Sequence, residues 1–120
     1  MRSLVLLLAV GCCCLLAASA ATAAPAAPPI KLVGTVGPGF TITLMKGGKP
    51  FKSLPAGAYT ITIRDLSNIH NFHLSGPGVN KLTSVGGKGN SNWSVGFKHG
   101  KYHFQCDPHA SSMKGNFTVQ

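Results

Sequence analysis

Apolar and polar residues alternate along most of the chain from residue 30 onward, with the two-residue period of half-buried β-strands. The clearest case is the segment 59–64, where Tyr59, Ile61 and Ile63 alternate with hydroxyl and charged side chains. Turns rich in Gly, Pro and Lys, such as 46–50 and 55–57, separate these segments. The predicted strands are 30–33, 40–44, 59–64, 69–74, 93–97, 102–106 and 115–119.

These strands set the expected architecture. About seven strands without an amphipathic helix or an internal repeat indicate an all-β fold, a Greek-key two-sheet β-sandwich. In the segment 40–44 the alternation predicts that Phe40, Ile42 and Leu44 face the core. Residues 79–92 are rich in Gly, Ser, Asn and Lys and show little periodicity, so we expect a long loop there.

The N-terminal segment has a different pattern. A short basic start at Met1 and Arg2 precedes an apolar run over 4–16 and a stretch of small residues over 17–23, which is the order of a secretory signal peptide. The apolar run is shorter than the roughly 20 residues that a spanning helix needs. We therefore expect a cleaved signal peptide (1–23, cut after Ala20 or Ala23), a Pro/Ala tether (24–29) and one domain (30–120), with no membrane span after cleavage.

Export makes the cysteines informative. Three of the four lie at 12–14 and would leave with the signal peptide, so Cys106 alone would remain in the mature chain. A lone exported cysteine has no internal disulfide partner and is a free thiol, an intermolecular partner or a ligand. Idle thiols are disfavoured in oxidising compartments, which favours the ligand. A lipid anchor through one of the three N-terminal cysteines is a weaker alternative to a free periplasmic or secreted protein.

The segment around Cys106 brings three metal-binding side chains together. Cys106 lies on the inward parity of its strand, Pro108 breaks that strand, and His109 and Met113 follow within a short loop. A thiolate, two imidazoles and a weakly bound thioether form the ligand set of blue-copper sites. Two structural alternatives stay open at this point, a buried core thiol at Cys106 and a core plug at Met113.

The second imidazole is chosen by strand parity. His70 shares a face with Phe72 and Leu74 and is expected to point inward, whereas His73 points the other way. The remaining two are less suitable, because His103 faces out of its strand and His99 lies in a turn. Asn71 follows His70 and is expected either to hydrogen-bond to the loop bearing Cys106 or to be an ordinary strand-end residue.

The ordered pattern of these residues resembles a known family. His70-Asn71, followed by Cys106-x-x-His109-x-x-x-Met113 before the last strand, resembles the cupredoxins, especially the plastocyanin, amicyanin and pseudoazurin type. The segment 70–73 is similar to the His-Asn-x-His of amicyanin, and 106–109 to the Cys-x-Pro-His of plastocyanin and amicyanin, with Pro108 stiffening the loop. The gap between His109 and Met113 is intermediate between those of amicyanin and plastocyanin, which leaves the copper–Met distance open.

This resemblance implies a function. It implies one mononuclear type 1 copper held by His70, Cys106, His109 and Met113, cycling between Cu(I) and Cu(II) in a small exported electron carrier, with His109 near the surface. The alternative is a copper-binding or copper-delivery protein with His73, His99 and His103 as auxiliary donors. A metal-free binding module is a third possibility. An enzyme is disfavoured, because four protein ligands leave no open position for substrate.

The charge of the chain bears on its partners. Formal net charge is +9, and only Asp65 and Asp107 are acidic. The lysines are scattered singly and are not interleaved with aromatic residues, so a nucleic-acid partner is not expected. We expect a monomer whose redox partner is an acidic protein.

Overall fold

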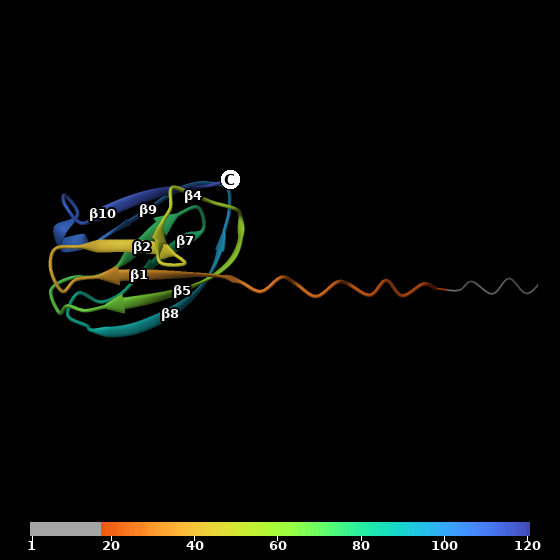
Figure 1. Cartoon of the computed structure of the whole chain (residues 1–120), viewed down its shortest axis with the longest axis horizontal. Coiled ribbons are helices and arrows are strands. Elements are labelled where there is room, and N and C mark those ends of the chain that lie inside the picture. Colours follow the sequence, from red (N-terminus) through yellow and green to blue (C-terminus); the bar gives the residue numbers. More distant parts are fainter. Residues whose placement is uncertain (1–17) are drawn as a thin grey trace, which may run out of the picture.

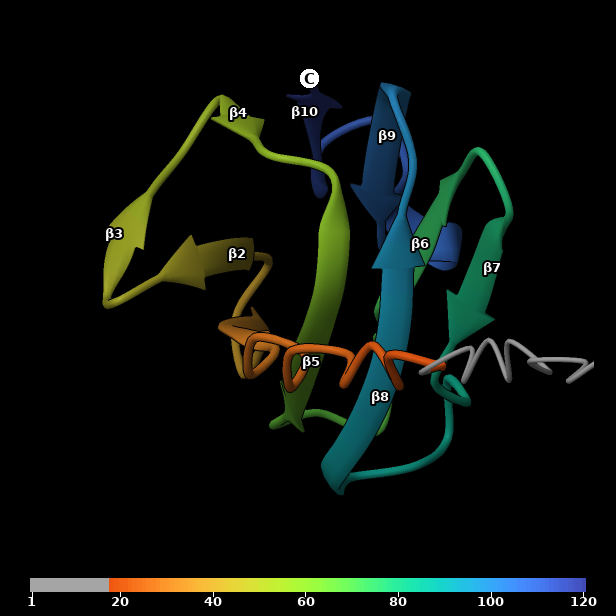
Figure 2. The same cartoon turned by 90° about the vertical axis from the view of Figure 1, so that its right-hand side faces the viewer.

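The computed structural model describes residues 18–120, and almost all regular structure in this range is β-strand. Ten strands form two five-stranded sheets that pack face to face (Figures 1 and 2). The order in the first sheet is β3 (Lys49–Pro50), β2 (Ile42–Lys46), β1 (Ile30–Val36), β5 (Gly57–Asp65) and β8 (Gly89–Phe97). The order in the second sheet is β4 (Ser53–Leu54), β10 (Lys114–Val119), β9 (Gly100–Gln105), β6 (His73–Gly76) and β7 (Val79–Leu82). The predicted all-β sandwich is confirmed.

Each of the seven predicted strands has a counterpart, and β3, β4 and β7 are additional. The first two contain only two residues each. The third falls within 79–92, where we expected a loop, and β8 also begins there, at Gly89. That prediction was wrong because β7 and β8 are edge strands of their sheets, and their residues within 79–92 are mostly polar and exposed, without apolar alternation.

The alternation identified the core correctly along the central strands. Tyr59, Ile61 and Ile63 of β5 are fully buried between the sheets. Gly34 of β1 faces them, and a Cβ there would lie 2.6 Å from Ile63 and 2.9 Å from Phe72. Glycine at this position therefore lets Phe72, which precedes β6, enter the core and stack on Phe104 at 5.6 Å between ring centroids.

Phe40 is the exception to the predicted core. It is 64% exposed and lies before β2, which begins at Ile42. The Gly37 N–H donates to the Thr41 carbonyl at 2.9 Å, so residues 38–40 form the tip of a closed turn and strand pairing starts after it. Proline and glycine inside this turn override the local alternation.

The N-terminal residues that are described lie outside the sandwich. Residues 18–29 are exposed at every position and leave the domain where β1 begins (Figure 1). The predicted signal peptide lies largely outside the described residues, and its cleavage stays a prediction. Within residues 18–120 no helix has the length and apolar character to cross a membrane.

Candidate metal centre

Two loops at one end of the sandwich carry the candidate ligands. The first, 66–72, connects β5 to β6, and hydrogen bonds shape it. Ser67 N–H donates to Asp65 Oδ1 at 3.1 Å. At the other end of the loop, Phe72 N–H donates to Thr83 Oγ1 at 2.9 Å, and Thr83 N–H donates to the Phe72 carbonyl at 3.0 Å. His70 lies just before Phe72 in this loop and is fully buried. The loop therefore presents His70 from a segment that is tied at both ends.

The second loop follows β9. Pro108 lies within a short 3-10 helix, η1 (Asp107–His109), and the chain then returns to β10. Cys106 N–H donates to the Met113 carbonyl at 2.9 Å, and the N–H groups of His109 and Met113 donate to the carbonyls of Cys106 (3.0 Å) and His109 (2.9 Å). These bonds close the loop and fix the positions of Cys106, His109 and Met113 relative to one another.

The structure brings three of the predicted donor atoms together. The Nδ1 atoms of His70 and His109 are 3.0 Å apart, and Cys106 Sγ lies 3.6 Å from the first and 3.5 Å from the second. Metal–nitrogen and metal–sulfur bonds are about 2.0–2.3 Å long, so donors that share one transition-metal ion are separated by roughly 3–4 Å. This donor set therefore fits a single metal ion bound between the two loops.

Burial distinguishes the four predicted ligands. His70 and Cys106 are 0% exposed and Met113 is 1% exposed, whereas His109 is half-buried. Met113 belongs to the closed loop through its backbone bonds, but its role as axial ligand stays a prediction. One face of the site is therefore buried and the other, formed by His109, reaches the surface.

His70 does not have the contacts of an ordinary buried histidine. Its Nε2 is the one buried side-chain nitrogen or oxygen without a hydrogen-bond partner in the described part of the chain. Its Nδ1 has contacts only with Cys106 and His109. Most buried polar groups are satisfied, and exceptions often have a functional reason. A proton on Nε2 leaves the Nδ1 lone pair free to bind a metal.

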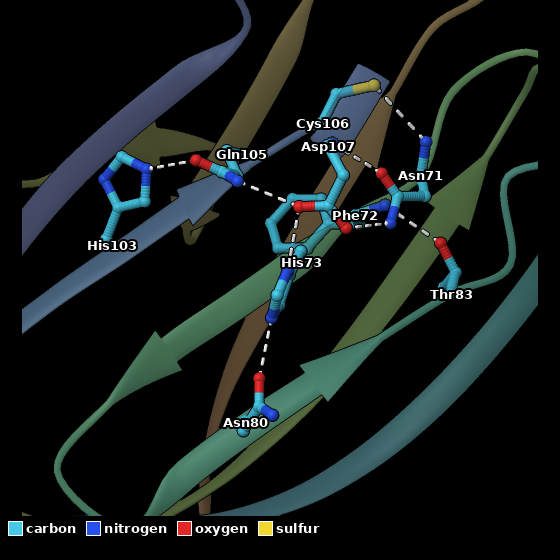
Figure 3. A network of polar contacts seen from close by, with 9 residues as sticks. All are labelled: Asn71, Phe72, His73, Asn80, Thr83, His103, Gln105, Cys106 and Asp107. Carbon is cyan, nitrogen blue, oxygen red and sulfur yellow. Dashed lines mark hydrogen bonds and ion pairs between the residues drawn. The ribbon is translucent and has the colours of Figure 1, made fainter. Parts of the chain in front are cut away.

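Asn71 links the two loops (Figure 3). Its backbone N–H points at Cys106 Sγ, 3.5 Å away, and its side-chain N–H donates to Asp107 Oδ2 at 2.8 Å. In return, the Asp107 backbone N–H donates to Asn71 Oδ1 at 2.7 Å, which fixes the orientation of the amide. The expected hydrogen bond to the loop of Cys106 is present. Asn71 is also buried, because it lies outside the regular strand on which the parity argument relied.

Sequence reasoning missed Asp107 as the centre of a polar network. Its carboxylate accepts hydrogen bonds from Asn71 and, at 2.8 Å each, from Gln105 and His73. Burial raises the pKa of Asp107, but these hydrogen bonds and the nearby charge of His73 outweigh it and lower the pKa. The sequence did hold a signal for this residue: Asp107 is one of only two acidic residues in the chain, and it directly follows Cys106.

Phe40 is the second residue that sequence reasoning misplaced. Its exposed ring packs edge-on against both imidazoles, with centroid distances of 5.1 Å to His70 and 4.9 Å to His109. It thus covers the outer side of the candidate site. Alternation predicted a core position for Phe40 and could not indicate this one, because a turn places the ring there.

The other three histidines lie outside the donor cluster. His99 is exposed in its turn, and His103 bonds to Asn116 at 2.7 Å and Gln105 at 2.9 Å. His73 contacts Asp107 and Asn80 on the outer face of the second sheet. The three donors of the cluster are the only group of its kind among residues 18–120.

Comparisons with known proteins bear on the fold. No protein-family model and no curated protein matches the chain. Among solved structures, reduced rusticyanin is similar with a TM-score of 0.59 and 20% identity, covering 80% of this chain and 82% of that one. Rusticyanin from Thiobacillus ferrooxidans has a TM-score of 0.54 and 21% identity over 79% of each chain. A Cu(I) amicyanin variant has a TM-score of 0.49 and 18% identity over 75% and 82%. The chain has the cupredoxin fold, and the predicted resemblance is confirmed at the level of the fold.

Proposed function

We propose that this protein is a type 1 copper-binding electron carrier that acts outside the cytoplasm. The observation that carries the proposal is the convergence of His70 Nδ1, His109 Nδ1 and Cys106 Sγ within 3.0–3.6 Å of one another. Two imidazoles and a thiolate with a weak axial thioether, here assigned to Met113, are the ligands of blue-copper sites. The cupredoxin fold supports this assignment.

The surrounding residues suit the donors to this role. Copper bound there would supply one-electron Cu(I)/Cu(II) chemistry. Cys106 would bind the metal as its thiolate, and the N–H of Asn71 points at its sulfur. The closed loop and the Asn71–Asp107 hydrogen bonds hold the donor atoms in place. A fixed donor geometry keeps the rearrangement between oxidation states small, as an electron carrier needs.

The surface near the site favours contact with a protein partner. Phe40, Ile69 and Leu66 are 64%, 51% and 37% exposed, and they belong to the loops at the metal end of the sandwich. His109 reaches the surface beneath Phe40. We propose that electrons enter and leave at this apolar end, through the ring of His109.

The charge distribution supports an acidic partner. Six of the nine lysines, all exposed, lie at strand ends or turns remote from the metal end: 31, 46, 49, 52, 98 and 101. Asp65 is buried, and Asp107 is engaged in hydrogen bonds. An acidic partner would be attracted at long range by this positive field, with salt slowing association. The contact itself would form at the apolar metal end, with the protein acting as a monomer.

Copper delivery on the same fold is the second candidate, and the imidazoles of His73 and His103 outside the cluster are its support. The two candidates differ in whether copper leaves. An electron carrier retains its ion in both oxidation states, whereas a delivery protein releases Cu(I) to an acceptor. Four protein donors leave no position for substrate, so we do not propose an enzyme.

Voltammetry of the copper-loaded protein with a Cu(I) chelator present tests the proposal. We expect a reversible one-electron wave that persists over repeated cycles, with no transfer of copper to the chelator. In Met113→Leu the wave should shift in potential while copper is retained, because the axial thioether tunes the site without holding it. Loss of Cu(I) to the chelator from the unmodified protein would favour delivery instead.

A further inference from the structure

A continuous chain of hydrogen bonds joins the outer face of the second sheet to the sulfur of Cys106 (Figure 3). It begins at Asn80 on β7, whose Oδ1 lies 2.6 Å from His73 Nε2. His73 Nδ1 then lies 2.8 Å from Asp107 Oδ1, and Asp107 Oδ2 accepts from the Asn71 side chain at 2.8 Å. Asn71 N–H closes the chain on Cys106 Sγ. His73 is therefore three hydrogen bonds away from a proposed ligand.

Both ring nitrogens of His73 face oxygen atoms, which suits the doubly protonated imidazolium. Neutral imidazole has one N–H, whereas the imidazolium has two and donates to Asp107 and Asn80 together. Burial lowers the pKa of His73, but the bonds to Asn80 and Asp107 and the charge of Asp107 outweigh it, so the pKa lies above the ordinary value. The proton is thus held by a defined pair of acceptors.

Few other charged groups face His73. Gln105 on β9 joins Asp107 Oδ1 to His103 Nε2 through bonds of 2.8 and 2.9 Å. On β7, the exposed Lys81 follows Asn80. The neighbouring strands β7 and β9 contain no carboxylate, so the one acid that contacts His73 is Asp107 of η1.

We propose that His73 is a positioning residue of the metal centre, and that the proton it carries is coupled to the metal through Asp107 and Asn71. This inference rests on the proposed copper site. Its physical basis is twofold: the imidazolium orients the Asp107 carboxylate toward Asn71, and its positive charge is linked to Cys106 Sγ through three hydrogen bonds. Loss of the proton weakens the Asp107–Asn71 contact and removes that charge together.

The sign of the coupling follows from charge. A positive His73 disfavours the more positive Cu(II) form, so the reduction potential is higher with the proton bound and falls as pH rises through the pKa of His73. By linkage, the reduced protein binds this proton more tightly, and each electron delivered by the electrode brings in a fraction of a proton. We expect the proton affinity of His73 to be about threefold higher in the reduced than in the oxidised protein, because solvent screens the interaction between this partly exposed side chain and the metal. At 59 mV per tenfold for one electron, this ratio corresponds to a change of about 28 mV in the reduction potential.

A measurement on the metal-free protein tests the coupling without copper. In a pH titration followed by NMR, the Asn71 side-chain amide should shift with an inflection that matches the His73 ring. In His73→Gln, which keeps a hydrogen-bonding side chain but cannot titrate, that inflection should vanish, while His99→Gln should retain it. The inference would be overturned if the chemical shift of the Asn71 amide did not change with the titration of His73, or if the inflection persisted in His73→Gln.

The copper-loaded protein gives the second readout. Between about pH 6 and 9 the reduction potential of the unmodified protein and of His99→Gln should fall by about 28 mV more than that of His73→Gln. Equal pH dependence in all three proteins, with a blue-copper spectrum in each, would refute the coupling and leave the electron carrier intact. If no such spectrum forms, the proposed function fails, and the metal-free titration alone decides the role of His73.

Discussion

The two ends of this sandwich bury different kinds of side chain. At the end remote from the candidate metal centre, rings of Tyr59, Phe97, Tyr102 and Phe117 pack at centroid distances of 4.8–5.4 Å. The Tyr102 hydroxyl accepts from Lys98 N–H and donates to the Pro77 carbonyl, both at 3.0 Å. This end is apolar and its polar atoms are satisfied, so its burial stabilises the fold.

The metal end buries polar groups. His70, Asn71 and Cys106 are at most 1% exposed, and one nitrogen of His70 has no partner. Burying such groups costs free energy, which the aromatic end must offset. The comparison indicates that the two ends have different roles: changes at the aromatic end should alter stability alone, whereas changes at the metal end should also alter the donor atoms. Four predictions test this difference, beginning with the largest effect.

Phe117→Ala should have the largest effect on stability. It removes a buried ring that packs on Phe97 and Tyr102, and large-to-small changes of this kind cost about 3–5 kcal/mol. Denaturant unfolding measures the loss. The fraction that stays folded should bind copper with an unchanged visible spectrum. A changed spectrum in that fraction would show that the two ends are not independent.

Asn71→Ala should have a smaller effect on stability and a clear effect on the metal centre. It leaves the Asp107 backbone N–H without its acceptor and removes the amide donor to the Asp107 carboxylate, at a cost of about 1–3 kcal/mol. The visible spectrum should shift, because the loop of Cys106 loses its cross-link. Asn90→Ala, on the exposed edge strand β8, is the matched control and should change neither quantity.

Tyr102→Phe tests the polar part of the aromatic end. The ring stays, but the Lys98 N–H and the Pro77 carbonyl lose the hydroxyl to which both are hydrogen-bonded. We therefore expect the free energy of unfolding to fall by about 1 kcal/mol. Thermal unfolding of this variant beside Tyr59→Phe, whose hydroxyl donates to a single carbonyl at 2.7 Å, would compare the two tyrosines. A destabilisation equal to that of Phe117→Ala would contradict the ordering.

The smallest effect is the pH dependence of the His73–Asp107 pair. The pKa of His73 is raised in the folded state, so its stabilisation is complete below the ordinary pKa and is lost as pH rises through the raised value. The lowered pKa of Asp107 acts oppositely, and its contribution is lost as pH falls through that value. A half-exposed pair contributes less than about 1 kcal/mol. Unfolding across pH 3–9, compared with His73→Gln, measures it; a stability that rises above neutral pH through His73 would have the wrong sign.

Sequence alone predicted the aromatic end more completely than the metal end. Tyr59 and Phe117 lie in regular strands, where alternation reports burial directly. His70 was also placed correctly, but Asn71 beside it is buried as well, which alternation does not allow. The positions of Phe40 and Asp107 at the site were not predicted, because they depend on a turn and on a short 3-10 helix, whose contacts join distant segments. Local pattern therefore predicts strands well and loop-borne contacts poorly.

The visible and electron paramagnetic resonance spectra of the protein after addition of one equivalent of Cu(II) test the central claim most directly. An intense thiolate-to-copper band with narrow copper hyperfine splitting, absent in Cys106→Ser at unchanged thermal stability, is the predicted result. A weak spectrum of ordinary Cu(II), or one that Cys106→Ser leaves unchanged, would contradict a blue-copper site at the metal end.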